Sequence, residues 1–156
     1  MAVKITDVKV ILTAPEGINL VAVKVLTNQD GLYGLGCATF AYRALAVKCV
    51  IEEYLKPLLV GRDAEEIEEL WQLMHQNAYW RNGPVENNAI SGIDMALWDI
   101  KGKVANLPVY QLLGGASREH VIAYSHATGR DIPETLDAFA KYKEKGFKAI
   151  RVQCGI

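Results

Sequence analysis

The sequence predicts two parts, an α+β unit over residues 1–115 and the start of a parallel β/α array over residues 116–156. Three observations lead to this fold class. Apolar and polar residues alternate in the first forty positions, as in β-strands, and apolar residues then recur every three or four positions over the next eighty, as in helices. After Gly115 the pattern becomes strand, helix and strand, which is typical of a β/α repeat.

Three strands are predicted at the start of the chain, over residues 3–12, 20–26 and 32–39. Asn28-Gln29-Asp30-Gly31 is a turn signal between the second and the third, so we expect an antiparallel three-stranded meander. One face of such a sheet has to be covered by other parts of the chain.

Four helices are predicted to supply this cover. The first ends at Gly61, the second begins at the capping-box pair Asp63 and Glu66, and a short fourth helix runs from Pro108 to Gly114-Gly115. The expected apolar stripes of the first three are Val47, Val50, Ile51, Tyr54, Leu55 and Leu58; Ile67, Leu70, Trp71, Met74 and Ala78; and Ile90, Ile93, Leu97, Ile100 and Val104.

A strand over residues 121–126, a helix opened by Asp131 and a strand over residues 147–152 are predicted next. The expected buried stripe of this helix includes Leu136, Phe139 and Ala140. The crossover is long enough for parallel pairing. Because a buried strand needs neighbours on both sides, we expect the sequence to be part of a longer polypeptide.

Composition excludes several classes of protein. The 156 residues are 51% hydrophobic, which excludes disorder, and a net charge of -1 gives no basic surface for nucleic acid or an anionic membrane. No apolar run approaches the roughly 20 residues that cross a bilayer, and no signal peptide is evident, so we expect a cytoplasmic protein. Cys37, Cys49 and Cys154 lack metal-site spacing and are expected to be buried, reduced thiols.

Two residues of the β/α part could carry chemistry. His126 and Arg151 are each expected at the carboxyl end of a parallel strand, where β/α folds collect their binding residues. A hydrogen-bonded structural histidine remains the alternative for His126. For Arg151 the alternatives are an internal ion pair and stabilisation of charge on a substrate.

Three further features of the first part have a structural and a functional interpretation. Gly31-x-x-Gly34-x-Gly36 has its glycines in the wrong order for a dinucleotide-binding loop. The structural interpretation is therefore preferred, in which the glycines let the strand backbone approach a neighbouring element closely. Trp80 and Arg81 could close over a ligand, or Trp80 could anchor a surface loop. Asp94 and Asp99 lie on different faces of one helix and are expected to be salt-bridge or capping partners.

The segment 89–103, AISGIDMALWDIKGK, resembles the N-terminal signature of the mandelate racemase and muconate lactonising branch of the enolase superfamily. Pro108-Val109 and Leu112-Leu113-Gly114 continue this pattern. Within that branch, segments 78–85, 114–119 and 148–153 are similar to the mannonate dehydratase group, which includes the starvation-sensing proteins.

The resemblance implies a capping domain over residues 1–115, followed over residues 116–156 by the first strands of a modified (β/α) TIM barrel. It also implies an Mg²⁺-dependent acid-sugar dehydratase, or hydro-lyase, that forms a homo-oligomer. Such an enzyme removes the proton α to a carboxylate and then eliminates the β-hydroxyl. The metal ligands of this group lie on later strands, so we expect none in this chain.

The resemblance also implies roles for individual residues. His126 matches a histidine that contacts substrate, and Arg151 matches an arginine that assists a tyrosine base located further along the chain. Gln153 stands where the racemase-like branches have a second lysine, and an amide cannot accept a proton at neutral pH. This substitution favours the dehydratase group.

One position departs from the group. Ala41 stands where the dehydratases have an asparagine in a loop over the active site, and alanine offers no hydrogen bond to a sugar hydroxyl. The expected substrate is therefore mannonate or another hexonate, selected by loops that include Ala41, Trp80 and Arg81. The alternatives are a weak or silent relative that binds an acid sugar or senses a metabolite and, less favoured, an isolated structural module.

Overall fold

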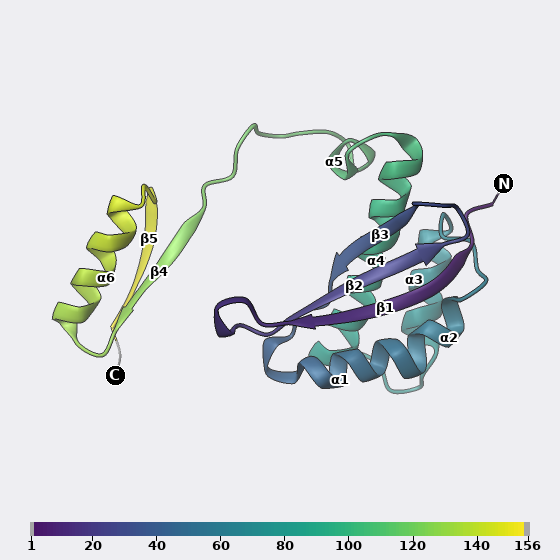
Figure 1. The fold of residues 1–156 in the computed structure, drawn as a ribbon, viewed down its shortest axis with the longest axis horizontal. Coiled ribbons are helices and arrows are strands. Elements are labelled where there is room, and N and C mark those ends of the chain that lie inside the picture. The colour runs from purple at the N-terminus through teal and green to yellow at the C-terminus, as the bar shows by residue number, and fades with distance from the viewer. Residues whose placement is uncertain (1, 155–156) are drawn as a thin grey trace. The chain divides into compact units, whose positions relative to one another are not determined.

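The computed structural model describes residues 2–154, which divide between Gly115 and Ala116 into two compact units (Figure 1). Each unit is described by itself. Among the described residues no helix is long and apolar enough to cross a membrane.

The first unit contains an antiparallel sheet of three strands, β1 (Ile5–Thr13), β2 (Leu20–Thr27) and β3 (Tyr33–Cys37), in the order β1-β2-β3. A short helix, η1 (Pro15–Gly17), lies between β1 and β2. The register pairs Val8 with Val25, which are both buried, and the predicted meander is confirmed.

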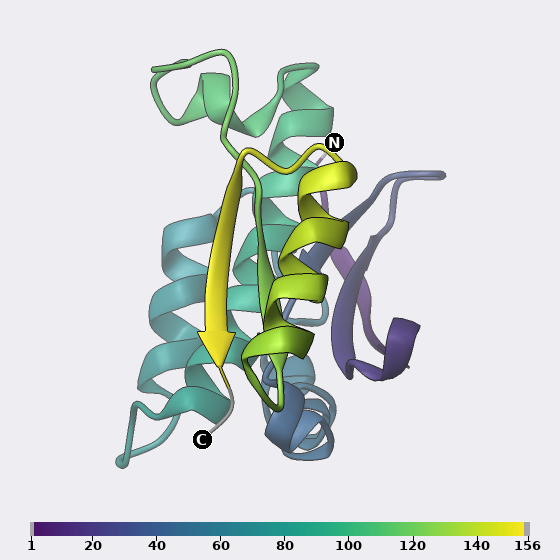
Figure 2. The same ribbon diagram turned by 90° about the vertical axis from the view of Figure 1, so that its left-hand side faces the viewer.

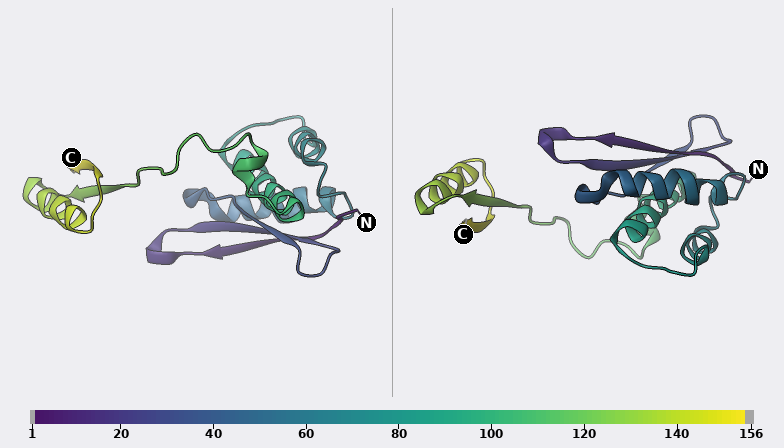
Figure 3. Two further views of the ribbon diagram at one scale, coloured as in Figure 1. Left: turned by 90° about the horizontal axis from the view of Figure 1, so that it is seen from above. Right: turned by 90° about the horizontal axis from the view of Figure 1, so that it is seen from below.

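Helices cover one face of this sheet, as the two views of Figure 3 show. In chain order the helices that follow the sheet in this unit are η2 (Ala41–Arg43), α1 (Ala44–Cys49), the π-helical segment η3 (Val50–Leu55), α2 (Lys56–Leu59), α3 (Ile67–Gln76), α4 (Pro84–Ala105) and α5 (Val109–Leu112). The last of them, α5, packs against α4 and has no buried residue, so the prediction that it helps to cover the sheet was wrong. The core between the layers contains Val21, Val23, Val47, Ile51, Leu70, Met74, Ile93 and Leu97.

Strand β3 lies directly against α4. A Cβ added to Gly34 would lie 1.9 Å from the Ala96 carbonyl oxygen, and one added to Gly36 would lie 1.9 Å from that of Gly92. The glycines therefore let the strand and helix backbones approach closely, which confirms the structural interpretation of this motif.

Two side chains of α4 form hydrogen bonds with backbone groups at the free edge of β3. The Asp99 carboxylate accepts a hydrogen bond of 2.8 Å from the Leu35 N–H, and Lys103 Nζ donates one of 2.7 Å to the Tyr33 carbonyl. Asp99 and Lys103 also form an ion pair at 2.7 Å. Asp99 is thus a salt-bridge partner, as predicted, and it protects an edge that could otherwise pair with another chain.

Several local predictions were wrong. Helix α3 begins at Ile67, because Asp63 instead bridges to Lys4 and accepts a hydrogen bond from the Glu65 N–H, so it does not cap the helix. Cys37 and Cys49 are exposed, since each lies on the outer side of its element, and the side chain of Cys154 is outside the described residues. The stripe positions that the structure leaves exposed are Tyr54, Ala78 and Val104.

The second unit is a parallel strand-helix-strand unit of β4 (Tyr124–Gly129), α6 (Ile132–Glu144) and β5 (Ala149–Cys154). Figure 2 shows α6 lying along one face of the two strands. Asp131 caps α6, as predicted, by accepting a hydrogen bond of 2.9 Å from the Glu134 N–H. The predicted burial of Leu136 and Ala140 was wrong, because α6 presents Thr135 rather than these residues to β4.

Candidate functional site

The parallel register places His126 directly beside Arg151 on adjacent strands. Register partners in neighbouring strands project to the same face of a sheet. Ala127, the next residue of β4, is fully buried on the face that α6 covers. His126 and Arg151 therefore share the face opposite α6, and both residues are exposed there.

Both residues lie in the middle of their strands, so the prediction that they end the strands was wrong. Thr128 pairs with Gln153 and Gly129 with Cys154, which extends both strands beyond His126 and Arg151. The physical reason is that the pairing partners on the neighbouring strand fix where a strand ends, whereas the sequence pattern predicted strands that stopped at residues 126 and 152.

The surroundings of this pair are polar on the open face. The His126 ring lies 5.2 Å from the Tyr124 ring, measured between centroids. Within residues 2–154 the Arg151 guanidinium has no ion-pair partner, so an internal ion pair does not explain its presence in this part of the protein. The exposed Arg151 guanidinium can therefore bind an anionic group.

Ala41 begins the short helix η2, which follows strand β3 in the first unit. Its carbonyl accepts a weak hydrogen bond of 3.4 Å from Asn19 Nδ2, while its methyl side chain offers none. The neighbouring Phe40 and Tyr42 rings pack edge to face, with centroids 6.3 Å apart, and Tyr42 is exposed. This loop therefore presents aromatic surface, and the Asn19 amide, from the residue before β2, lies against its backbone.

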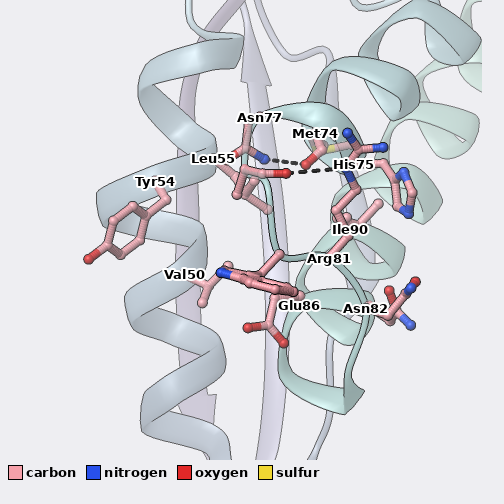
Figure 4. A pocket seen from close by; sticks show the side chains of 13 residues that line it. Val50, Tyr54, Leu55, Met74, His75, Asn77, Arg81, Asn82, Glu86 and Ile90 are labelled. Atoms are coloured by element: carbon pink, nitrogen blue, oxygen red, sulfur yellow. Dashed lines mark hydrogen bonds between the residues drawn. The ribbon is translucent and has the colours of Figure 1, made fainter.

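Trp80 and Arg81 line a cavity of about 220 Å³ in the first unit (Figure 4). Its floor is apolar and contains the buried residues Leu55, Met74 and Ile90. Its rim is polar and includes His75, Asn77, Arg81, Asn82, Glu86 and Asn87. Trp80 is 86% exposed, so it does not anchor its loop in the core.

Two irregular segments form the walls of this cavity. Val50, Tyr54 and Leu55 come from the π-helical segment η3, whose wider turn the sequence pattern did not reveal. On the other side the loop reverses through positive φ angles of 76° at Asn82 and 108° at Gly83. Arg81 Nε donates to the Ala78 carbonyl at 3.2 Å, and Asn77 donates to the Met74 carbonyl. The geometry suits a small ligand with an apolar part and polar ends.

The pKa of the Asp94 carboxyl is raised above its ordinary value. Burial is the main cause, and the nearby Glu68 carboxylate adds to it. Among the described residues neither a hydrogen bond nor an ion pair stabilises the Asp94 carboxylate, so the expected salt-bridge partner was not found. Asp94 is on α4, in the first unit, whereas His126 and Arg151 belong to the second.

The part of the chain that the structure describes contains no group of three or more His, Cys, Asp or Glu residues that could hold a metal ion. The polar groups on the open face are the His126 imidazole, the Arg151 guanidinium, the Gln153 amide and the hydroxyls of Tyr124 and Thr128. This set suits an anionic, hydroxylated ligand better than a hard cation such as Mg²⁺, which prefers carboxylates.

Comparison with known proteins gives the chain a family. Residues 2–114 match the model of the mandelate racemase / muconate lactonizing enzyme N-terminal domain. The chain is 55% identical over 154 residues to a D-galactonate dehydratase family member of Enterococcus gallinarum (strain EG2), covering 99% of the chain and 38% of that relative. It is 55% identical over 153 residues to a D-mannonate dehydratase of Sphingomonas sp. (strain SKA58), covering 98% and 38%.

A solved structure extends the similarity to both units. The crystal structure of an enolase from Pantoea ananatis, with bound D-gluconate and Mg, is 56% identical and matches with a TM-score of 0.90. The match covers 99% of this chain and 37% of that one. The chain thus spans about 38% of the length of the two curated relatives named above.

Proposed function

The chain belongs to the mandelate racemase/muconate lactonizing enzyme family, and from this premise we propose that the complete protein is an acid-sugar dehydratase. The identity of 55% over almost the whole chain, to relatives named for galactonate and mannonate dehydration, supports a hydro-lyase acting on a hexonate. D-mannonate is the first candidate substrate and D-gluconate and D-galactonate are the next.

The observation that carries the proposal is the register of His126 with Arg151 on the face that α6 leaves open. Arginine stays protonated and cannot itself remove the proton α to a carboxylate. Its charge would instead favour the phenolate form of a tyrosine base in the remainder of the protein and so lower the pKa of that phenol. His126 would donate a hydrogen bond to a substrate hydroxyl.

The proposed reaction loses one water. The base takes the proton from C2, the hydroxyl leaves C3 with a proton, and the resulting enol becomes a 2-keto-3-deoxy acid. The proposed Mg²⁺ cofactor, whose ligands we place outside this chain, would stabilise the negative charge that develops on the carboxylate. Gln153 supports this assignment, because its amide cannot replace the second lysine base of the racemase-like branches.

The loops of the first unit are proposed to select the substrate. Trp80 and Arg81 would contribute an apolar face and a cation from the rim of the 220 Å³ cavity. In the loop after β3, Ala41 offers no side-chain hydrogen bond to a substrate hydroxyl, and this difference would change which hexonate is preferred. Oligomerisation of the complete protein is also proposed, by analogy with the family.

Ala41 favours a second candidate function, a silent relative that binds an acid sugar and reports on metabolism. Without a hydrogen bond at this position, the substrate could be held too loosely for turnover while its carboxylate still binds. Stabilisation of the full-length protein by a hexonate in a thermal-shift titration, without product, would favour this function over catalysis.

The deciding experiment is a screen of the purified full-length protein against a panel of hexonates with Mg²⁺. Formation of a 2-keto-3-deoxy acid from at least one of them is the expected result. An Ala41→Asn variant serves as a matched comparison and should raise activity toward D-mannonate. Absence of product from every hexonate, for both proteins, would refute the dehydratase proposal.

A further inference from the structure

The open face of the β4–β5 pair carries a further row of side chains next to His126 and Arg151. The register pairs Thr128 with Gln153, two residues beyond the first pair on each strand. Because alternate residues project to the same face, all four side chains share the face opposite α6. Thr128 and Gln153 are both exposed.

Strand geometry gives the spacing of this cluster. Two residues span about 6.6 Å along a strand and neighbouring strands lie about 4.8 Å apart, so a single six-carbon acid can contact both rows. The Thr128–Gln153 row is nearer the carboxyl ends of the strands, from which ligands approach in β/α folds. A substrate that reaches Arg151 from this side therefore passes over the Thr128 and Gln153 side chains on the open face.

Helix α6 supports the Thr128 position from the opposite face of the sheet. Ala127 is fully buried, and a Cβ added to Gly129 would lie 2.5 Å from the backbone nitrogen of Thr135 in α6. The residues on either side of Thr128 are therefore packed against the helix, whose first turn Asp131 caps. Such support fixes the backbone from which the Thr128 hydroxyl projects, and a selective binding site requires a fixed support of this kind.

The chemistry of the row matches hydroxyl groups. A threonine hydroxyl donates and accepts, and a glutamine amide offers two donors and an acceptor, yet neither is charged at neutral pH. A carboxylate is better served by a cation such as Arg151. We infer that Thr128 and Gln153 form a subsite for the hydroxyls of a polyhydroxy acid and determine which stereoisomer is accepted; this inference rests on the proposed function.

The test compares Thr128→Val and Gln153→Met with the wild type in the full-length protein. Loss of one uncharged hydrogen bond should lower kcat/KM for the preferred hexonate about three- to tenfold, and the ranking of stereoisomers should change. Thr128→Ser keeps the hydroxyl and should restore the wild-type value. Ser125→Ala is the matched control, because Ser125 is a hydroxyl residue of the same strand on the face toward α6.

Deoxy analogues of the substrate provide a measurement that does not depend on folding of the variants. The analogue that lacks the contacted hydroxyl should be a poorer substrate for the wild type and should lose nothing further in the variant. If the wild type binds hexonates without turnover, affinities from calorimetry replace kcat/KM.

The outcomes separate the two proposals. Unchanged kcat/KM and an unchanged ranking in both variants, or a wild type indifferent to the 4-, 5- and 6-deoxy analogues, which keep the leaving hydroxyl at C3, would overturn the inference and leave the dehydratase proposal intact. A wild type that neither binds nor converts any hexonate would overturn the proposed function and the inference together.

Discussion

Replacing Gly36 by alanine tests the close approach between β3 and α4. The new methyl group would lie 1.9 Å from the Gly92 carbonyl oxygen and 3.0 Å from the Ala96 nitrogen, whereas real Cβ atoms essentially never lie within 3.0 Å of another heavy atom. Both neighbours are helix backbone, which cannot rotate away. Strand and helix must therefore separate, and the buried layer formed by Val23 and Val25 on the adjacent strand loses contact.

The expected cost follows from known small-to-large substitutions. Overpacking a core costs typically 1–3 kcal/mol, and a clash with backbone belongs at the upper end, so we expect Gly36→Ala to lower the free energy of unfolding by about 3 kcal/mol. For a unit of this size that corresponds to a fall in Tm of roughly 10 °C.

Tryptophan fluorescence during urea unfolding is the appropriate measurement. Trp71, Trp80 and Trp98 all lie in the first unit, so the signal of the 156-residue chain reports on that unit alone. Leu35→Ala is the control, because Leu35 is half exposed on the opposite face of the same strand. If Gly36→Ala unfolds within about 0.5 kcal/mol of wild type, the close packing of β3 on α4 is refuted.

Three further predictions follow from the site and the fold. Arg151→Met in the full-length protein should abolish dehydration and leave Tm within a few degrees, since the guanidinium is exposed; a large fall in Tm would instead indicate a structural ion pair. Asp99→Ala should cost about 1.5 kcal/mol and speed amide exchange at Leu35, whereas unchanged exchange there would contradict the edge cap. Asp94→Asn should raise the stability of this chain at pH 7, because the pKa of Asp94 is raised above 3.8 in the folded state.

The sign of the Asp94 effect follows from proton linkage. Below the unfolded-state pKa both states are protonated, and the variant and wild type should match. As the pH rises, the unfolded state loses its proton first, so wild-type stability falls until the folded-state pKa is passed and stays lower above it. Urea unfolding between pH 3 and 7 measures this, and a variant with no gain at pH 7 would show that burial does not penalise the charge.

The local pattern was sufficient for most elements of the first unit. Alternation and turn residues predicted the meander, and helical spacing predicted the buried residues Ile90, Ile93, Leu97 and Ile100 of α4. It failed where a residue had a partner far away in sequence. Asp63 has the spacing of a helix cap, but its bridge to Lys4 in the sheet layer takes it out of that role.

The candidate site was less accessible to sequence reasoning. The pattern and the family resemblance pointed to His126 and Arg151 separately, while only the parallel register makes them neighbours on one face. The cavity beside Trp80 was not predicted, since its lining joins the segment Val50–Leu55 to residues of α3, α4 and the loop between them, and their contact is not visible in the sequence. The Thr128–Gln153 row was missed for a related reason, because the predicted strands ended at residues 126 and 152, before these two residues.

The amino-acid sequence by itself determined the order and type of the elements and the family, because apolar spacing, turn residues and a long signature are local properties of the chain. The tertiary structure decided which residues face one another. Strand register, the approach of β3 to α4 and the burial of Asp94 each depend on contacts between segments distant in sequence, and the free energy of such contacts is set only when the segments pack.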